Sequence, residues 1–376
     1  MKKFPFYFFY PNFWLLFNFF HILYRMKSII LAGGGTAGHI TPHLAIMPQL
    51  KKHFDKIYYF GSGKQIEKKF MQNEVTKIYD LSPPAFVRSL SLKNLLIPFK
   101  LYKAVKECED YLKQINPSVI FSKGGYCALP VCIAGFNLKI PVISHESDLT
   151  LGLANKLVAK RSTCLLTTFE QTAKGQENAQ YVGPLLRQEF FNKNKSESKK
   201  LLGITGDKPL LLVTGGSQGS KTINQALYNN LQEILRDFSV IHLYGKSNKP
   251  PYKAINGYYG FPFADMPTAI YACDIALSRG GSNTLFELLC TNTPSLIIPL
   301  KKASRGDQIK NAEYFYNKKA LLMADEEDLD KSITSLVKEL YSNRQALKEE
   351  MQKLNLQSGV SKTIEIIMRH AKKANV

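Results

Sequence analysis

The chain repeats one pattern in both of its halves: a short run of β-forming residues, a glycine turn and a longer helical stretch. This alternation is typical of a parallel sheet covered by helices. The clearest β-forming runs are SIILA, KIYYFG, SVIFS and PVISH in the first half and PLLLVTGG, VIHLYG, DIALSRGG and PSLIIPL in the second. We therefore predict an α/β chain with two Rossmann-like, doubly wound parallel-sheet domains that face each other across a cleft.

A weak internal repeat supports this division. The stretches SVIFSKGGYCALPVCIAGFNLKIPVIS and CDIALSRGGSNTLFELLCTNTPSLIIP each read strand, basic residue with Gly-Gly, helix, strand. A length of 376 residues also exceeds what one core usually fills. We expect a first domain over residues 26–190, a second over residues 191–350 and a C-terminal helix over residues 351–376 that crosses back onto the first. The Lys-rich residues 192–200 near the junction indicate an exposed linker or a helix start.

Residues 1–25 differ from the rest because aromatic side chains are unusually dense there. Prolines and polar residues interrupt the apolar stretch, which makes it short for a spanning helix, and no small-residue cleavage site follows. Three interpretations stand: a start codon assigned too early, because Met26 leads directly into the first strand; an interfacial aromatic anchor; or a signal sequence. A signal sequence would place a reduced, nucleotide-binding domain outside the cell, so we rank it last.

Net charge and cysteine spacing restrict the partners and the compartment. The formal net charge of +20 predicts attraction to nucleic acid, anionic lipid or phosphorylated substrates. The six cysteines show no C-x-x-C spacing and stand mostly in apolar runs, as reduced core cysteines do. These features predict a cytoplasmic protein without a zinc framework.

The glycine-rich segment LAGGGTAGHITPH, residues 31–43, raises the question of a nicotinamide cofactor. Gly33, Gly35 and Gly38 satisfy G-x-G-x-x-G, the fingerprint of dinucleotide-binding folds. That fingerprint also needs an acidic residue at the end of the second strand. Here the second strand ends in Gly-Ser-Gly, and Asp55 precedes the strand, at its wrong end. We therefore expect no nicotinamide cofactor.

Glycines follow strands at four places: residues 33–38, 124–125, 215–219 and 280–281. Such glycines let backbone N–H groups approach an anion, and the helix N-terminus behind them adds about half a positive charge. Because ligands bind beyond the carboxyl ends of parallel strands, the turns of both domains should face one cleft. A pair of substrates carrying several phosphates would explain all four turns, whereas a tight turn without a ligand explains only one of them well.

Polar side chains gather in the first two turns of the helix after Gly280-Gly281: Ser282, Asn283, Thr284 and Glu287. Glu287 stands in an otherwise apolar stretch and is suited to accept two hydrogen bonds from a ribose diol. The alternative is that Glu287 lies on an exposed helix face and binds no ligand. Gln308 and Asn311 open a later helix and would complete the same pocket.

Five stretches in this order, with DQIKNA following them, carry a family resemblance: GGGTAGHITPHLA, SKGGYCALP, HESDLTLGLANKLVA, VTGGSQGSKTINQAL and SRGGSNTLFELLCTNTPSLIIPL. From about residue 26 to its C-terminus the chain closely resembles the MurG family, the N-acetylglucosaminyltransferases that convert lipid I to lipid II in bacterial cell-wall synthesis. The resemblance implies a GT-B fold, an N-terminal domain that faces the membrane-bound acceptor and a C-terminal domain that holds UDP-N-acetylglucosamine.

The resemblance also assigns residues. Its donor-site positions in this chain are Thr36, Ala37, Gly38, Asp148, Arg187, Ser217, Gln218, Phe263, Arg279, Ser282, Asn283, Thr284, Leu285, Phe286, Glu287 and Gln308. Its acceptor-side positions are Gly34, Gly35, His39, Gly124, Gly125, Tyr126, His145, Glu146 and Asn155. By position, Phe263 would lie beside the uracil, Glu287 would bind the ribose and Gln308 would reach the sugar hydroxyls.

This chain departs from the family pattern at three places. Ala37 stands where the family usually has Gly, and residues 145–148 read His-Glu-Ser-Asp where the family usually reads H-E-Q-N. Residues 183–185 read Gly-Pro-Leu in place of a Gly-Asn-Pro turn. These changes leave the reaction class intact, but the sequence specifies neither the peptide stem of the acceptor nor the oligomeric state.

The resemblance implies inverting transfer, in which the 4-hydroxyl of the acceptor's N-acetylmuramic acid attacks the anomeric carbon from the face opposite UDP. The reaction needs a base for the hydroxyl proton, and His39 is our first choice because imidazole titrates near neutrality. Asp148 and Glu146 are the alternatives. A further alternative is that His39 only forms a hydrogen bond with the backbone or a phosphate.

Departing UDP must be neutralised, and helix N-termini with Arg187 and Arg279 would do this without a metal or other cofactor. The only D-x-D in the chain, residues 328–330, follows three acidic residues and indicates an acidic helix start. We predict no obligatory metal.

Residues 82–106 interleave apolar and basic side chains, with Phe86, Ile97 and Phe99 among the apolar ones. Such a patch would hold the first domain on anionic lipid, at the cytoplasmic face of the bacterial inner membrane. A normally buried amphipathic helix is the alternative.

Four other functions compete with this one. Another GT-B transferase with a different acceptor and a UDP-N-acetylglucosamine 2-epimerase share the donor motifs. A non-catalytic sugar-nucleotide sensor would tolerate Asp148. A nucleic-acid-binding protein would explain the charge, but no recognition motif is present and the basic residues are dispersed, so we expect no nucleic-acid partner.

Overall fold

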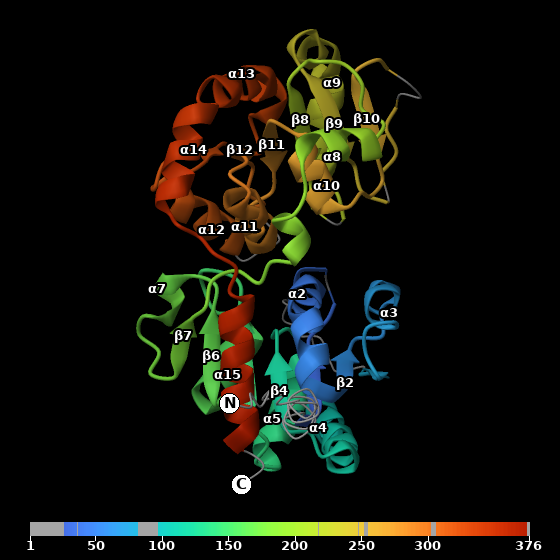
Figure 1. The fold of residues 1–376 in the computed structure, drawn as a ribbon, viewed down its shortest axis with the longest axis vertical. Coiled ribbons are helices and arrows are strands. Elements are labelled where there is room, and N and C mark those ends of the chain that lie inside the picture. Colours follow the sequence, from blue (N-terminus) through green and yellow to red (C-terminus); the bar gives the residue numbers. More distant parts are fainter. Residues whose placement is uncertain are drawn as a thin grey trace, which may run out of the picture.

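A computed structural model describes residues 26–35, 37–81, 97–216, 218–246, 248–251, 255–301 and 306–373. The extension 1–25, Thr36, Ser217 and residues 82–96 of the apolar and basic segment lie outside the described residues. The described chain forms two parallel sheets with helices on their faces, one sheet in each half (Figure 1). The predicted α/β architecture is confirmed.

The first sheet has seven parallel strands in the order β3-β2-β1-β4-β5-β6-β7. Its strands are β1 (Met26–Ala32), β2 (Phe54–Gly61), β3 (Lys77–Asp80), β4 (Val119–Ser122), β5 (Val142–Glu146), β6 (Cys164–Thr167) and β7 (Ala179–Tyr181). The helices between them are α2 (Ala37–His53), α3 (Gln65–Met71), α4 (Ile97–Ile115), α5 (Ala128–Asn137), α6 (Leu153–Val158) and α7 (Glu170–Ala173), with a 3₁₀ turn at Ala159–Arg161.

The second sheet has six parallel strands in the order β10-β9-β8-β11-β12-β13. Its strands are β8 (Leu210–Thr214), β9 (Ser239–Leu243), β10 (Tyr258–Phe261), β11 (Ile275–Ser278), β12 (Ser295–Ile297) and β13 (Leu322–Met323). A 3₁₀ turn at Gln188–Phe190 precedes its helices, which are α8 (Lys195–Leu201), α9 (Lys221–Asp237), α10 (Met266–Ala272), α11 (Ser282–Cys290), α12 (Asp307–Tyr316), α13 (Leu329–Ser342) and α14 (Arg344–Lys353). A last helix, α15 (Val360–Lys373), follows them.

Each central strand is buried on both faces, which explains its unbroken apolar sequence. In β1, Ile29 and Leu31 pack into one core cluster, while Ile30 and Ala32 pack into another on the opposite face. Successive side chains of a strand point to opposite faces, so such a strand needs helices on both sides. The second sheet follows the same rule, with separate cores on its two faces.

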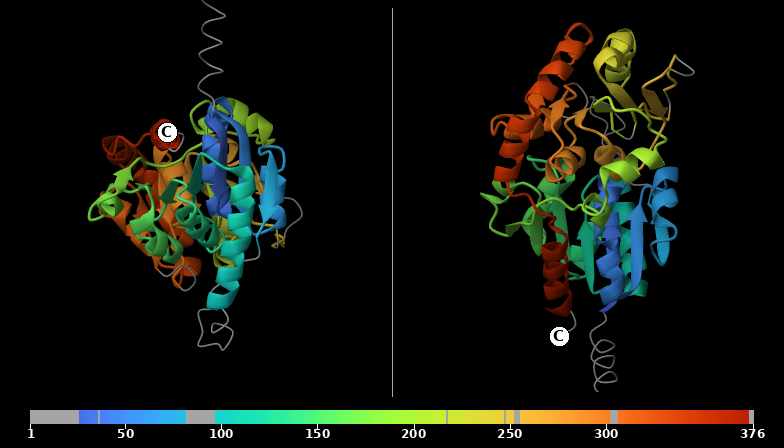
Figure 2. Two further views of the ribbon diagram at one scale, coloured as in Figure 1. Left: turned by 90° about the horizontal axis from the view of Figure 1, so that it is seen from below. Right: turned by 45° about the horizontal axis from the view of Figure 1, so that its top comes forward.

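The C-terminal helix α15 packs on the first half although it follows the second in sequence. Ile364 and Ile367 belong to the same core cluster as β1 and α2, and Figure 2 shows α15 beside the first sheet, away from α13 and α14. Met351 packs in the core of the second half, so the chain crosses back after α14 and not at residue 351. The two crossing segments meet where Gly359 N donates to Pro184 O, at 2.8 Å.

Two local predictions concern helix starts. Within residues 192–200, α8 begins at Lys195, and the side chain of Asn194 accepts a hydrogen bond from Glu197 N at its N-terminus. The only D-x-D lies at the start of α13, where Asp330 is in the first helical turn. Both segments therefore open helices.

Candidate active site

The first glycine turn, Gly33 to Gly35, is fixed by side chains from the second strand and the helix after it. Tyr59 Oη donates to Gly33 O at 2.5 Å, and Gly35 N donates to Glu67 Oε1 at 2.6 Å. Gly35 has a φ of +89°, which favours glycine. Buried side chains therefore hold the backbone of this turn.

His39 lies in the first turn of α2, and its Nδ1 is 2.8 Å from Gly34 O. A carbonyl oxygen only accepts, so Nδ1 carries the hydrogen and Nε2 keeps its lone pair. Burial lowers the pKa of His39 below its ordinary value, and the Lys123 ammonium lowers it further. The neutral imidazole, which is the form that accepts a proton, therefore predominates at neutral pH.

The second glycine turn, Gly124-Gly125, approaches the first. Both of its glycines have a positive φ, of +73° and +80°. A methyl group placed on Gly125 would lie 3.1 Å from His39 Cε1, and one on Gly35 would lie 3.1 Å from Tyr126 Cε1. The structure therefore brings five of the acceptor-side residues together: Gly34, Gly35, His39, Gly125 and Tyr126.

Glu146, at the end of β5, organises the loop that follows it. Its Oε1 accepts from the backbone N–H groups of Ser147 and Asp148, at 2.9 and 3.1 Å. Its Oε2 accepts from Gly152 N and from Asn155 Nδ2, at 2.8 and 2.9 Å. With four donors on its carboxylate, Glu146 is suited to shape this loop and poorly suited to take a proton from a substrate.

His145 is fully buried, and its side chain contacts Lys123, a residue that the sequence analysis did not single out. Its Nδ1 accepts from Lys123 Nζ at 2.5 Å, and the same ammonium donates to Ser147 Oγ at 2.6 Å. Burial lowers the pKa of Lys123 to about 8. His145 thus lies beneath the acceptor side, where it cannot touch a substrate. The only sequence signal for Lys123 was the basic residue before Gly-Gly, repeated by Arg279 in the second half.

Helix α11 presents a mixed set of side chains at the second domain's glycine turn. Leu285 and Phe286 pack in the core of this domain, so they can offer a ligand only main-chain atoms. Glu287 is buried, and burial raises the pKa of its carboxyl group to about 8, with Asp265 adding to the effect and Arg187 opposing it. Arg187 itself pairs with Asp265 at 3.6 Å. The exposed helix face that we weighed for Glu287 is therefore excluded.

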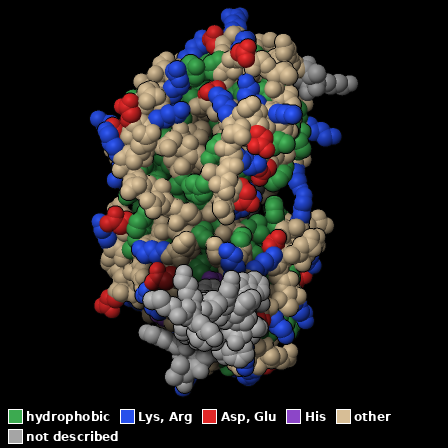
Figure 3. Space-filling model, viewed as in Figure 1, with side chains coloured by type: hydrophobic (Ala, Val, Ile, Leu, Met, Phe, Trp, Pro, Cys, Tyr) green, Lys and Arg blue, Asp and Glu red, His purple; other side chains and the backbone are tan. Residues whose placement is uncertain are grey.

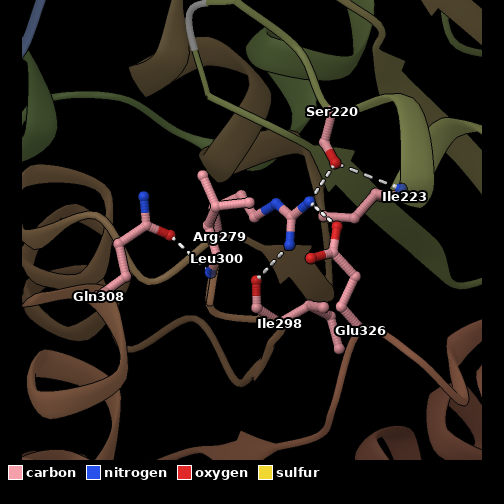
Figure 4. Close-up of polar contacts among 7 residues, drawn as sticks. All are labelled: Ser220, Ile223, Arg279, Ile298, Leu300, Gln308 and Glu326. Carbon is pink, nitrogen blue, oxygen red and sulfur yellow. Dashed lines mark hydrogen bonds and ion pairs between the residues drawn. The ribbon is translucent and has the colours of Figure 1, made fainter. Parts of the chain in front are cut away.

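Arg279 is held inside the second domain (Figure 4). Its guanidinium donates to Ile298 O at 3.1 Å and to Ser220 Oγ at 2.6 Å, and it pairs with Glu326. Arg279 therefore braces the strand ends around the turn, because its buried guanidinium is held by three partners inside the domain, whereas the Arg187 side chain is 29% exposed and forms a longer ion pair. This corrects the expectation that Arg279 would help to neutralise UDP.

Gln308 lies on the other side of the same turn. Its Oε1 accepts from Leu300 N at 3.0 Å, which leaves its amide nitrogen pointing away from that contact (Figure 4). A methyl group on Gly280 would lie 2.5 Å from Gln308 O. The helix that carries Gln308 therefore packs directly on the glycine turn.

A proline in α2 creates one of the contacts between the two halves. Pro42 has no N–H, so Gly38 O lacks the donor that residue 42 would give it in a regular helix. Asn283 Nδ2, from α11 of the second half, donates to Gly38 O at 3.1 Å and to Thr41 Oγ1 at 2.9 Å. The second half thus supplies a donor to a carbonyl group that the proline leaves without its regular helical partner.

The loop after β5 is held to the second half in the same way. Asn311 is fully buried, and we expected it to complete the donor pocket; instead its Oδ1 accepts from Leu149 N at 2.9 Å and its Nδ2 donates to Asp148 Oδ1 at 2.9 Å. Ser282 Oγ donates to Ser147 O in the same region. The carboxyl ends of the two sheets therefore face each other and are joined by direct hydrogen bonds.

The remaining predicted residues are more exposed or lie partly outside the described chain. The Phe263 side chain is 54% exposed, and Gln218 contacts Asn248 only through its main-chain oxygen, at 3.4 Å. Thr284 is partly buried at the start of α11. For Ala37 only the backbone, at the first position of α2, is described.

Glu67 corrects our interpretation of the glycine fingerprint. An acidic residue does stand beyond the second strand, six residues after its end, and its carboxylate accepts from Gly35 N and from Ser62 N, at 2.6 and 2.7 Å. In a dinucleotide-binding fold an acid at this edge binds a ribose. Here the acid is used by the chain itself. The sequence signal was a lone Glu at the start of a Lys-rich helix, which we did not weigh.

Over the described ranges, no three His, Cys, Asp or Glu side chains lie where they could share a metal ion. Five of the six cysteines are buried, and all six are free thiols. Independence from metal stays a prediction, to be tested by activity.

Two family models match the chain: the N-terminal domain of glycosyltransferase family 28 over residues 29–167 and the C-terminal domain of the same family over residues 210–366. The matches cover both sheets and the turns described above. The chain therefore belongs to glycosyltransferase family 28.

Two curated relatives make the identification more specific. Proteins from Clostridium botulinum (strain Langeland) and Clostridium tetani bear the name UDP-N-acetylglucosamine–N-acetylmuramyl-(pentapeptide) pyrophosphoryl-undecaprenol N-acetylglucosamine transferase. The first is 42% identical over 354 residues, which cover 92% of this chain and 100% of that protein. The second is 38% identical over 351 residues, with coverages of 92% and 98%. The resemblance to the MurG family is confirmed.

Solved structures agree on the fold. The crystal structure of Acinetobacter baumannii MurG matches with a TM-score of 0.71 at 23% identity, over 91% of this chain and 99% of that one. A putative UDP-N-acetylglucosamine 2-epimerase from Listeria monocytogenes matches with a TM-score of 0.65 at 11% identity, over 93% and 97% of the two chains. At these identities the likeness establishes the two-domain fold alone, which both enzymes share.

Proposed function

We propose that this chain transfers N-acetylglucosamine from UDP-N-acetylglucosamine to the 4-hydroxyl of the N-acetylmuramyl unit of lipid I, which gives lipid II for peptidoglycan synthesis. The names of the relatives supply the donor and the undecaprenyl-linked acceptor. The observation that carries the proposal is the position of His39, whose Nδ1 is bound to Gly34 O where the two glycine turns meet.

In the proposed reaction His39 Nε2 takes the proton of the acceptor hydroxyl as that oxygen attacks the anomeric carbon. The C–O bond to UDP breaks on the opposite face, and the product forms with inversion. The sugar passes through a state with positive charge at the anomeric carbon, and negative charge develops on the departing phosphate. The N-termini of α9 and α11 behind their glycine turns, with Arg187, are suited to receive that charge.

Asp148 is the rival base. Burial raises the pKa of its carboxyl group to about 6, and Glu146 adds to the effect. Asn311 Nδ2 donates to one of its oxygens at 2.9 Å. This hydrogen bond joins Asp148 to the second half, so we assign it the positioning of the loop after β5 and give the proton transfer to His39.

For the donor we propose that Glu287 accepts hydrogen bonds from the ribose diol, that Phe263 lies against the uracil and that Gln308 binds sugar hydroxyls through its amide nitrogen. Burial of Glu287, exposure of Phe263 and the direction of the Gln308 amide are compatible with these roles. Ser282 and Asn283 contact the first half directly, so bound donor would have to share or replace those contacts.

The function is tested by following UDP release from UDP-N-acetylglucosamine with and without a lipid I analogue. We expect release that depends on the acceptor and is unchanged by EDTA, because helix N-termini and Arg187 replace a metal. Conversion of UDP-N-acetylglucosamine without acceptor would favour the epimerase, whose fold the chain shares. Binding of the donor without any turnover would favour a sugar-nucleotide sensor.

We further propose that the first domain sits on anionic lipid at the cytoplasmic face of the inner membrane. No helix among the described residues has both the length and the apolar character needed to cross a bilayer. At the start of α4, Phe99 and Tyr102 are 71% and 61% exposed, and the exposed Lys100 and Lys103 lie beside them. Figure 3 shows Lys and Arg side chains spread over both halves of one face, which fits a general attraction to anionic surfaces better than a nucleic-acid groove.

Replacing Phe99 and Tyr102 together by serine is expected to reduce flotation with vesicles that contain anionic lipid. The double change removes the two most exposed apolar side chains of α4, while transfer to a short-chain, water-soluble acceptor should be unaffected. The matched control is the exposed, solvent-facing pair Leu201 and Tyr316 of the second half, replaced in the same way. Equal flotation of the wild type and the α4 variant would contradict membrane contact through this helix.

A further inference from the structure

One peptide group connects Glu67 to His39. The carbonyl of Gly34 and the N–H of Gly35 belong to the same peptide unit. The N–H donates to Glu67 Oε1 at 2.6 Å, and the carbonyl accepts from His39 Nδ1 at 2.8 Å. Carboxylate, peptide and imidazole therefore form one continuous line of hydrogen bonds.

The loop is built around the Glu67 carboxylate. Glu67 is fully buried, and its oxygens also accept from Ser62 N at 2.7 Å and from Ser62 Oγ. A methyl group on Gly34 would lie 2.6 Å from Glu67 Oε1. The glycine at position 34 thus lets the backbone come close enough for its peptide to touch both the carboxylate and the imidazole.

Hydrogen bonds in a chain polarise one another, and the effect is larger away from water. A negative charge on the N–H side of the peptide draws its hydrogen and makes the carbonyl oxygen a stronger acceptor. That oxygen then holds the proton of His39 on Nδ1, which leaves the lone pair on Nε2. The negative charge of Glu67 also favours the positively charged imidazole that forms when His39 takes up a proton.

We propose that Glu67 is a positioning residue for proton transfer, acting on His39 through the Gly34-Gly35 peptide. Its role matches that of the acid behind a catalytic histidine, with a peptide group placed between the two side chains. The inference rests on the proposed role of His39 as the base, but the hydrogen-bond chain itself can be tested without turnover.

Other charged groups face His39 as well, and the test must separate them from Glu67. Lys123, at the end of β4, lowers the pKa of His39, and Asp148, in the loop after β5, raises it. His43, one turn further along α2, is fully buried and stays neutral because burial lowers its pKa to about 3. Of these charged groups, only Glu67 is connected to His39 by hydrogen bonds to the Gly34-Gly35 peptide.

The test compares wild type, Glu67→Gln and the control Glu74→Gln by NMR of the full chain with ¹⁵N-labelled histidine, read at several pH values. The His39 signals are assigned by their loss in His39→Gln. We expect the wild type to carry its proton on Nδ1, and Glu67→Gln to lower the His39 pKa by about half a unit or more and to mix the two tautomers. Glu74 is a surface carboxylate paired with Lys51, so its variant should match the wild type.

Kinetics give a second measurement. Glu67→Gln should lower kcat roughly 10- to 100-fold, as removal of the group that orients a metal-ligating histidine does. It should also move the acidic limb of the kcat/KM pH profile to lower pH, with the KM for UDP-N-acetylglucosamine changed less than threefold. A loss confined to KM would contradict the positioning role.

An unchanged His39 pKa and tautomer in folded Glu67→Gln would overturn the proposal, even if activity were lost. If Glu67→Gln does not fold, as judged by circular dichroism, Glu67→Asp is measured in its place; its shorter carboxylate should shift the His39 pKa in the same direction by less. A wild type without transferase activity would reject the proposed function, while the NMR comparison would still decide whether Glu67 acts on His39.

Discussion

Replacing His39 by alanine is expected to lower kcat for N-acetylglucosamine transfer by about 100-fold or more, within the usual range for loss of a general base. The physical reason is the geometry of the imidazole: Nδ1 is used by Gly34 O at 2.8 Å, and burial keeps the ring neutral, so Nε2 can accept the hydroxyl proton. The measurement is the initial rate of lipid II formation at saturating donor and acceptor.

The control for His39 is His53→Ala, at the other end of the same helix, which should retain the wild-type rate. Asp148→Asn separates the two candidate bases, because it removes a proton acceptor while leaving an amide that Asn311 can still bind. We expect the Asp148 variant to lose less activity than the His39 variant. Near-normal turnover of His39→Ala with only weaker donor binding would reject the base assignment.

The second large effect is expected at Glu287. The change Glu287→Gln should raise the KM for UDP-N-acetylglucosamine roughly 10- to 150-fold, because the amide oxygen can still accept from one ribose hydroxyl while the other loses a hydrogen bond to a charged group, which contributes about 1.5–3 kcal/mol. Turnover at saturating donor should fall much less, because Glu287 touches neither the anomeric carbon nor the acceptor in this account. The control is Glu339→Gln, a change at an exposed position of α13.

Glu287 also predicts how donor binding depends on pH. Burial raises the pKa of its carboxyl group to about 8, so at pH 6 the free protein holds this group protonated. The diol donates to the ionised form, and binding must then release a proton. Affinity for UDP-N-acetylglucosamine should therefore rise from pH 6 to pH 8, by roughly tenfold or more, and then level off.

Calorimetry at these pH values in two buffers with different ionisation heats measures both the affinity and the released proton. In Glu287→Gln the released proton should disappear and the affinity should become nearly independent of pH. A wild-type affinity that is flat between pH 6 and pH 8 would contradict the assignment of Glu287 to the ribose.

The central strands were predictable from sequence because they are buried on both faces. All eight runs that we took as strands form strands, from β1 to β12. The strands that we did not predict are short, and most lie toward the sheet edges. The residues of β3, β7, β10 and β13 are nowhere fully buried, so their sequences carry no continuous apolar run. The missed strand β6 is buried and as long as β4 and β11, but no glycine turn follows it to mark its end.

The glycine turns of the site were predictable from sequence, but the side chains that hold these turns and the loop after β5 in place were not. The sequence places His39 directly after the first glycine turn and Glu287 in the helix after the last one, because each of these turns follows a recognisable strand. The supporting side chains form hydrogen bonds with residues far away in the chain. Glu67 binds Gly35 N, Lys123 binds His145, and Asn311 binds Asp148, which lies 163 positions before it. No local pattern encodes such a pairing, so only the folded structure reveals it.

We propose above that this chain joins N-acetylglucosamine to the 4-hydroxyl of lipid I with inversion at the anomeric carbon. The most direct measurement is the linkage in the product, read by NMR after incubation of the full chain with UDP-N-acetylglucosamine and a lipid I analogue. We expect a β-linkage to the 4-position, formed together with one UDP per disaccharide. An α-linkage, a sugar on another hydroxyl, or no disaccharide from folded protein that binds the donor would contradict it.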